Sequence, residues 1–128
     1  MARRRVVRVF LHDNDSYLFA KKSRAKYRPS QIELEQGETP LEAAYVLLDI
    51  VEAHKAAVNC GPYEQRRGRT EFYYYAADVI VKPGQFERVK SEELRTCKRI
   101  GRQTRNIMYK MGLIRPAAGS EISCVYLF

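Results

Sequence analysis

The sequence predicts an α+β fold, and three observations carry that prediction. Short runs of alternating apolar and polar residues stand near the N-terminus, as expected for half-buried strands. A segment with strong helix-start signals follows residue 37, and residues 70–82 form a long aromatic and β-branched run that favours a strand. At 128 residues, with 45% hydrophobic and 30% charged residues, the chain has the size and composition of one globular domain spanning 1–128.

The N-terminal part predicts a β-hairpin followed by a basic loop. Residues 6–11 and 17–21 are the two strand-like runs, and the polar residues 12–16 between them suit a turn. Residues 21–28 are rich in Lys and Arg and end at Pro29. This loop therefore separates the hairpin from the first helix.

A first helix is predicted over about 39–54. Thr39 is a good N-cap, Pro40 suits the first helical position, and Glu42 completes a capping box. Residues 61–69 are interpreted as a basic connection that leads into the 70–82 strand.

The C-terminal part predicts a second helix over about 91–111 and a last strand over 122–128. Ser91 is followed by Glu92 and Glu93, acidic residues that favour a helix start, and Gly112 is a stop signal.

The three cysteines indicate a reducing environment. Cys60, Cys97 and Cys124 are far apart, lack Cys-x-x-Cys spacing and have no nearby His, which disfavours zinc. An odd count also argues against a disulfide framework, so we expect buried thiols in an intracellular compartment, the cytoplasm or an organelle matrix. Because no apolar run approaches the roughly 20 residues that cross a bilayer, no membrane association is expected.

Residues 35–44, Glu-Gln-Gly-Glu-Thr-Pro-Leu-Glu-Ala-Ala, resemble the stretch that opens the conserved helix of Nudix hydrolases. The hairpin before it resembles the strand pair that this family places upstream of its motif, so the match covers about residues 6–82. The resemblance implies an α/β/α sandwich. Its mixed sheet would be flanked by the motif helix, about 39–54, and by a basic amphipathic helix, about 91–111.

The resemblance fails at the residues that would hold metal. Gly37 and Glu38 match the motif, but its Arg falls on Val46 and its metal-binding glutamates fall on Leu47, Ile50 and Val51. Hard cations such as Mg²⁺ need oxygen ligands, which these side chains lack. We therefore predict a degenerate Nudix domain with no catalytic residues and no cofactor. Mg²⁺ enters only if the chain is an enzyme with a non-canonical site.

Two features of the first helix leave alternatives open. Glu38, Glu42, Asp49 and Glu52 share one stripe at helical spacing, of which Asp49 and Glu52 are weak metal candidates and a solvated face is the favoured interpretation. The apolar positions fill either a closed cleft, which is slightly favoured, or a patch for a protein partner. They are Ala43, Val46, Leu47, Ile50 and Val51.

The charge distribution points to a polyanion. The net charge is +8, and three basic stretches interleave cations with Tyr or Gly. Arg grips phosphate with a planar fork, and aromatic rings stack on unpaired bases. The predicted binding residues are Lys22, Arg24, Lys26, Tyr27, Arg28, Arg66, Arg67, Arg69, Arg95, Lys98, Arg99, Arg102, Arg105 and Tyr109.

These patterns favour RNA binding without catalysis, in a ribonucleoprotein assembly. The resemblance implies the same role, because degenerate Nudix domains serve as RNA-binding modules. One alternative is a pyrophosphohydrolase acting on a nucleoside diphosphate derivative with a non-canonical metal site. Another is a protein-interaction module that uses the apolar helix face.

Overall fold

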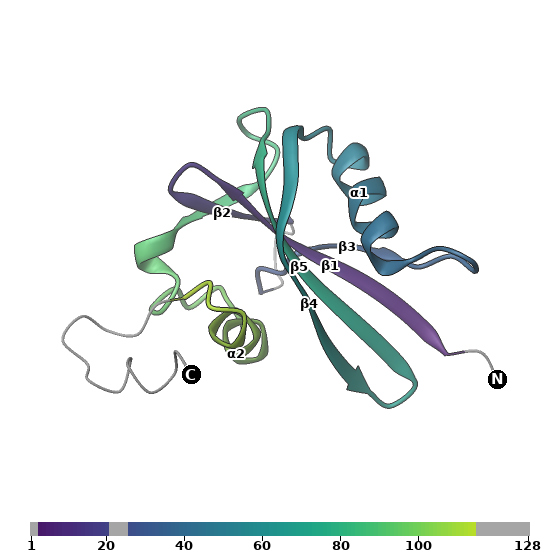
Figure 1. Cartoon of the computed structure of the whole chain (residues 1–128). Helices are drawn as coiled ribbons and strands as arrows, with labels where there is room; N and C mark the ends of the chain where they lie inside the picture. Colours follow the sequence, from purple (N-terminus) through teal and green to yellow (C-terminus); the bar gives the residue numbers. More distant parts are fainter. Residues whose placement is uncertain (1–2, 21–25, 115–128) are drawn as a thin grey trace.

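The structure, a computed structural model, describes residues 3–20 and 26–114. A mixed six-stranded sheet has the order β4-β5-β1-β2-β6, with β3 also paired to β1, and helices α1 and α2 lie on opposite sides of it (Figure 1). The predicted α+β sandwich, with its mixed Nudix-like sheet and two flanking helices, is confirmed. The predicted strand over 122–128 lies outside the described residues.

The central strand β1 (Arg4–Asp13) organises the sheet. It pairs antiparallel with β2 (Ser16–Phe19) through its second half and with β3 (Ser30–Glu33) through its first half. Along its other edge it pairs in parallel with β5 (Thr70–Ile80). The predicted hairpin and the 70–82 strand are therefore confirmed. The short strands β3 and β6 (Glu87–Lys90), four residues each, were not predicted from the sequence.

Helix α1 (Pro40–Ile50) starts where the sequence predicts and ends earlier. The Thr39 hydroxyl accepts a hydrogen bond from the Glu42 N–H at 3.2 Å, as expected of an N-cap. At the other end, Glu52 adopts φ 57°, and the Ala53 and Glu52 N–H groups donate to Leu48 and Asp49. This pairing is a Schellman motif, which stops the helix. The predicted end near residue 54 is wrong because Glu52 takes the left-handed position usually given to Gly.

The predicted basic connection over 61–69 is also wrong. Most of it belongs to β4 (His54–Arg67), a long strand at the sheet edge that pairs antiparallel with β5. Its register shifts three times, between His54 and Tyr63, so the strand is irregular. An edge strand that is exposed or half-exposed along its length tolerates the consecutive polar residues Glu64 to Arg67, which made the segment look like a loop in the sequence.

The second predicted helix is broken into two pieces. Residues 91–93 form a short 3-10 helix, residues 94–101 form turns, and α2 spans only Arg102–Lys110. Gly101 has an extended conformation at the N-cap position, and Ile100 bridges to Tyr27 on a distant segment. The apolar side of the predicted helix is nevertheless buried, since Leu94, Ile107 and Met108 are at most 2% exposed.

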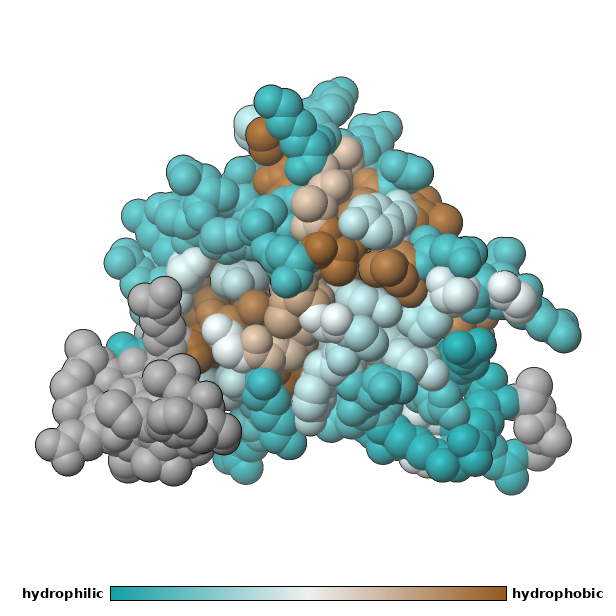
Figure 2. Space-filling model, in the orientation of Figure 1, coloured by the Kyte–Doolittle hydropathy of each residue, from teal (hydrophilic) through white to brown (hydrophobic). Residues whose placement is uncertain are grey.

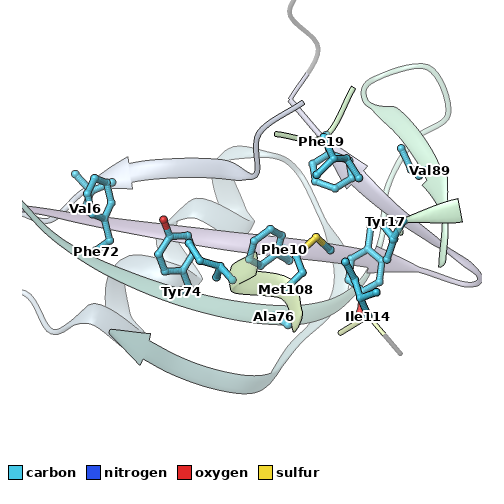
Figure 3. Close-up of a cluster of buried hydrophobic side chains, with 13 residues drawn as sticks. Val6, Phe10, Tyr17, Phe19, Phe72, Tyr74, Ala76, Val89, Met108 and Ile114 are labelled. Carbon is cyan, nitrogen blue, oxygen red and sulfur yellow. The ribbon is translucent and has the colours of Figure 1, made fainter. Parts of the chain in front are cut away.

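Each face of the sheet has its own hydrophobic core. The α1 side is built on Val7, Val9 and Leu11 of β1, with Leu47 and Leu48 of α1 packed over them. On the α2 side, Met108 packs with Phe10 and Ala76 of the sheet, while Val6 and Phe72 lie at one end of this cluster (Figure 3). The alternation of side chains along β1 therefore separates two chemically different surfaces.

Candidate nucleic-acid interface

Two basic stretches that are far apart in the sequence meet in the fold. The Tyr27 N–H donates to the Arg99 carbonyl at 2.6 Å, and the Lys26 Nζ donates to the Lys98 carbonyl at 2.6 Å. Tyr27 also forms a parallel bridge with Ile100. We call Lys26, Tyr27, Arg28, Lys98 and Arg99 the Tyr27–Arg99 cluster. The backbone holds these side chains together, so their proximity does not depend on attraction between like charges.

Tyr27 anchors this cluster. Its ring stacks on the buried Phe19 with a 5.9 Å centroid separation, and the Arg99 guanidinium lies 4.7 Å from the Tyr27 ring centroid. Tyr27 is therefore half-buried, whereas the four cations are exposed. A guanidinium held over an aromatic ring has lost part of its freedom before any ligand arrives.

The N-terminus of α2 lies beside the Tyr27–Arg99 cluster. A Cβ added at Gly101, the N-cap, would come within 4.0 Å of the Lys26 side chain, and no side chain caps the helix. The exposed Arg102 is the first residue of α2. Uncapped N–H groups and the helix dipole favour an anion, and the surrounding cations add to that field.

No carboxylate among the described residues forms an ion pair with the cations of the Tyr27–Arg99 cluster or with Arg102. Within residues 3–20 and 26–114, the ion pairs involve Arg3, Arg4, His12 and Arg88 instead. This surface therefore keeps its positive charge. Lys22 and Arg24, which the sequence also predicts to bind a polyanion, lie outside the described residues.

Arg105 makes local hydrogen bonds that the sequence did not predict. Its guanidinium donates to the carbonyls of Leu94 and Ile100 at 3.2 and 3.3 Å and to that of Cys97. The side chain is half-buried and holds the turns of residues 94–101 against α2. Its Nε and Nη2 donors are thus occupied by backbone carbonyls, and polyanion binding by Arg105 stays a prediction.

The other predicted residues of this region are exposed but do not share one helical stripe. Arg95 lies in the turns before α2, whereas Tyr109 lies in the last turn of α2, 39% exposed. Helical spacing no longer relates Arg95 and Arg99 to Arg102, so the predicted single basic helix face is replaced by a surface built from turns and a helix start.

The third basic stretch lies elsewhere, at the β4–β5 hairpin. Arg66 and Arg69 are exposed, while the half-buried Arg67 lies over the Phe72 ring at 5.4 Å. The Arg4 N–H donates to the Arg69 carbonyl at 3.2 Å, which adds the N-terminal arginines to the hairpin. A hollow of about 280 Å³ on the hairpin is lined by Glu64, Gln65, Arg66, Glu71, Phe72 and Tyr73.

Carboxylates offset part of the charge at this hairpin. Arg3 pairs with Glu71 at 2.9 Å and Arg4 pairs with Glu33 at 3.3 Å. The hydrogen bonds from Arg3 and Tyr73 hold the pKa of Glu71 below its usual value. The hairpin is therefore less suited to a phosphate backbone than the Tyr27–Arg99 cluster.

Sequence reasoning missed Arg8 on β1. Its Nε donates to the Gln31 Oε1 and its Nη1 to the Tyr74 hydroxyl, both at 2.9 Å, and its guanidinium stacks on Phe72. Arg8 occupies one position in an alternating strand, so no local cluster of cations marked it. The strand pairing alone brings Gln31 to it.

The metal-binding positions of the Nudix motif are divided between core and surface. Leu47 is 3% exposed and Val51 half-buried, whereas Val46 and Ile50 are 40% and 62% exposed. The prediction that all these residues fill the core is wrong for Val46 and Ile50, because α1 turns that edge toward solvent. None of the four carries an oxygen, so the side chains present do not fit a Mg²⁺ ion.

The remaining motif residues serve local structure. Gly37 has φ 84° in the turn before α1, and the Glu38 Oε1 accepts a hydrogen bond from the Glu35 N–H at 3.1 Å. The weak metal candidates Asp49 and Glu52 are exposed. Within the described part of the chain, no group of three or more His, Cys, Asp or Glu residues gathers as metal ligands.

The expected buried thiols and absence of a membrane span can be compared with the structure. Cys60 and Cys97 are free and half-buried rather than fully buried, and Cys124 lies outside the described residues. Among the helices of residues 3–20 and 26–114, none has the length and apolar content that a bilayer crossing requires.

Comparisons with known proteins identify the fold. No protein-family model and no curated protein sequence matches the chain. Among solved structures, it is similar to a Nudix-family hydrolase from Clostridium perfringens, with a TM-score of 0.67 and 16% identity, covering 87% of this chain and 97% of that one. A Nudix hydrolase from Nitrosomonas europaea gives 0.65 and 10%, covering 86% and 70%. A UDP-X diphosphatase gives 0.61 and 11%, covering 88% and 64%. The chain therefore has the Nudix hydrolase fold.

Proposed function

We propose that this chain, a Nudix fold without the metal ligands of its motif, binds RNA as part of a ribonucleoprotein assembly and does not hydrolyse diphosphates. The observation that carries the proposal is the meeting of two basic stretches at the uncapped start of α2. Lys26 lies beside the N-cap Gly101, and Arg102 is the first residue of α2, so cations adjoin N–H groups that already favour an anion. Phosphates along an RNA backbone fit a surface of several exposed cations better than a single small anion does.

Inactivity is supported by the chemistry of α1. A metal ion at the Nudix positions would face Leu47, Ile50 and Val51, which supply no oxygen. Hydrolysis in the Nudix fold needs cations held against the diphosphate, and these apolar side chains would not hold them.

Salt dependence of RNA binding tests the proposal. Affinity for a short single-stranded RNA, measured by fluorescence anisotropy, should fall with salt at a slope of roughly −0.7 per phosphate neutralised. The Arg99→Gln/Arg102→Gln variant should flatten the slope by about 1.4, one contact per arginine. The Lys55→Gln/Lys82→Gln variant loses the same charge from exposed positions outside the cluster and should keep the parental slope.

Two results would contradict the proposal. If the parent protein did not bind RNA at low salt, the RNA-binding proposal would be wrong. An equal loss of slope in both double variants would show a diffuse attraction by net charge rather than an interface at α2.

The fold favours a second candidate, hydrolysis of a nucleoside diphosphate derivative. The similarity to a UDP-X diphosphatase supports it, and Asp49 and Glu52 are the carboxylates at the exposed end of α1 that could hold Mg²⁺. A panel of such substrates with Mg²⁺ or Mn²⁺ separates the candidates. We expect no turnover above buffer, whereas metal-dependent phosphate release that is lost on Glu52→Gln would establish the enzyme.

A third candidate, a protein-interaction module, is supported by the exposed apolar side chains of α1. Leu41, Tyr45, Val46 and Ile50 are each at least 40% exposed. Hydrophobic surface gathers where α1 lies against β4 and β5 (Figure 2). A complex with a protein that withstands high salt and RNase, and is lost on Ile50→Glu, would favour this function.

A further inference from the structure

A row of cations lies over aromatic rings on the α2 side of the sheet, and two of these rings, Phe72 and Tyr74, are buried. Phe72 and Tyr74 are neighbours on β5, with ring centroids 6.2 Å apart, and Tyr63 on β4 lies 6.3 Å from Tyr74. We call this set the arginine–aromatic strip, and it consists of Arg67, Phe72, Arg8, Tyr74, Tyr63 and Lys110. Phe72 lies at the end of the core away from Met108 of α2 (Figure 3). The guanidinium groups of Arg8 and Arg67 lie over its ring there.

Arg8 is the fixed element of the strip. Its guanidinium carbon lies 4.4 Å from the Phe72 ring centroid, and two side-chain hydrogen bonds, to Gln31 and Tyr74, set the orientation of the plane. Arginine normally loses side-chain entropy when it binds a ligand, but here that ordering has already occurred in the free protein.

Part of the Arg8 guanidinium remains available. Stacking on Phe72 uses one face of the plane, and within the described residues its Nη2 makes no hydrogen bond. Arg8 is half-buried and its partner Gln31 is exposed, so the group reaches the surface. An oriented guanidinium plane with free donors can stack on a nucleobase and bond to its edge.

Arg67 extends the same surface. It lies over Phe72 at 5.4 Å, and its Nη2 donates to the Gln65 Oε1 at 3.2 Å. Its Nε is buried and lacks a hydrogen-bond partner within the described part of the chain. A buried donor without a partner is costly, and a ligand acceptor that reached it would relieve that cost.

The arginine–aromatic strip is connected to the Tyr27–Arg99 cluster by a short piece of chain. Only four residue steps separate Tyr27 from Gln31, so their Cα atoms lie no more than roughly 14 Å apart. Gln31 pairs with Arg8 across β3 and β1. A nucleic-acid strand whose backbone lies on the cluster therefore has the strip within reach of its bases.

We propose that the arginine–aromatic strip binds unpaired nucleobases, with Arg8 stacking on a base while the Tyr27–Arg99 cluster holds the phosphates. This inference rests on the proposed RNA function and makes it specific for single strands, because the bases of a duplex are stacked on one another and present only their edges. Stacking accepts any base, so the strip confers a preference for exposed bases rather than for a sequence.

The test compares a short single-stranded RNA with an abasic ribose-phosphate strand of the same length, using fluorescence anisotropy. The parent should bind the RNA about tenfold more tightly than the abasic strand. Arg8→Lys keeps the positive charge but removes the planar guanidinium. The ratio of RNA affinity to abasic-strand affinity should therefore fall close to one, while the affinity for the abasic strand changes less than about twofold. The matched control is Arg88→Lys, at an exposed arginine paired with Asp13, and it should keep the parental ratio.

The outcomes separate the two levels of the proposal. Equal affinity of the parent for both strands would overturn the base-stacking role and leave phosphate binding intact. Failure to bind either strand would overturn RNA binding itself. Retention of the tenfold ratio in Arg8→Lys would remove Arg8 from the site.

If Arg8→Lys does not fold, a second variant can test the role of Arg8 without replacing it. Gln31 is exposed, and Gln31→Ala frees the Arg8 Nε without altering the core. This variant should lower the RNA-to-abasic ratio by about threefold because the plane is less well oriented. An unchanged ratio would contradict the orienting role of Gln31 and, with it, the preset Arg8 plane.

Discussion

The two helices differ more in charge than in length, and the difference distinguishes the two sides of the sheet. Helix α1 contains Glu42 and Asp49 and no Lys or Arg, whereas α2 contains Arg102, Arg105 and Lys110 and no carboxylate. On the α1 side, the positions that match the metal ligands of the Nudix motif carry apolar side chains. The α2 side has cations held by backbone contacts and aromatic rings. The fold alone therefore does not fix the function, which depends on the side chains that each face carries.

The largest effect that we expect concerns the α1 side. Leu47→Glu places a carboxylate at a position that is 3% exposed, with no cation to pair it. Burying an unpaired charge should cost about 3 kcal/mol or more and lower the melting temperature by roughly 10 °C or more. The matched change Ile50→Glu, at a position 62% exposed, should cost less than about 1 kcal/mol.

Thermal unfolding followed by circular dichroism measures both variants. Similar melting temperatures for Leu47→Glu and Ile50→Glu would contradict the assignment of position 47 to the core and position 50 to the surface.

A smaller loss is expected on the α2 side when Arg105 is replaced. Arg105→Gln removes a charged donor from the carbonyls of residues 94, 97 and 100, which should cost about 2 kcal/mol in urea unfolding. Arg102→Gln should change stability by less than about 0.5 kcal/mol and weaken RNA binding instead. If the two variants had equal stability, Arg105 would not hold the turns before α2.

The smallest effect is a change in stability at alkaline pH. Burial, followed by the nearby Asp78 and Cys60, raises the pKa of Tyr17 from 10.0 to about 12. The unfolded chain therefore loses this proton first, so the contribution of Tyr17 is complete below about pH 10 and is lost as the pH rises toward 12. Tyr17→Phe should show a shallower fall in stability across this window in urea titrations. If the free energy of unfolding fell equally with pH in the parent and in Tyr17→Phe, the raised pKa of Tyr17 would be contradicted.

Local signals in the sequence predicted the parts of the fold that local chemistry determines. The Thr39 cap, the hairpin around Asn14 and the β5 strand all follow from neighbouring residues. The strand β4 and the break before α2 do not, because each depends on pairing or hydrogen bonds with residues outside the segment itself. Strand β5 makes β4 a strand, and the hydrogen bonds of Tyr27 and Arg105 replace helical ones in the turns before α2.

The sequence predicted which residues belong to the candidate site better than it predicted how they are arranged in space. Lys26, Arg28, Lys98 and Arg99 stand in basic stretches that the sequence marks clearly, and the fold brings these stretches together. Their helical spacing was misleading, since turns interrupt the helix. Arg8 carried no local signal, because its role depends on strand pairing with β3 and β5.

The contrast between the two sides can be tested by mapping RNA onto the protein. Amide resonances of the ¹⁵N-labelled chain should be followed by NMR as a short single-stranded RNA is added. We expect shifts concentrated at residues 26–31 and 98–105 and around Arg8, with α1 little changed. Shifts concentrated on α1 between Glu42 and Ile50, or no saturable shifts at low salt, would contradict this expectation.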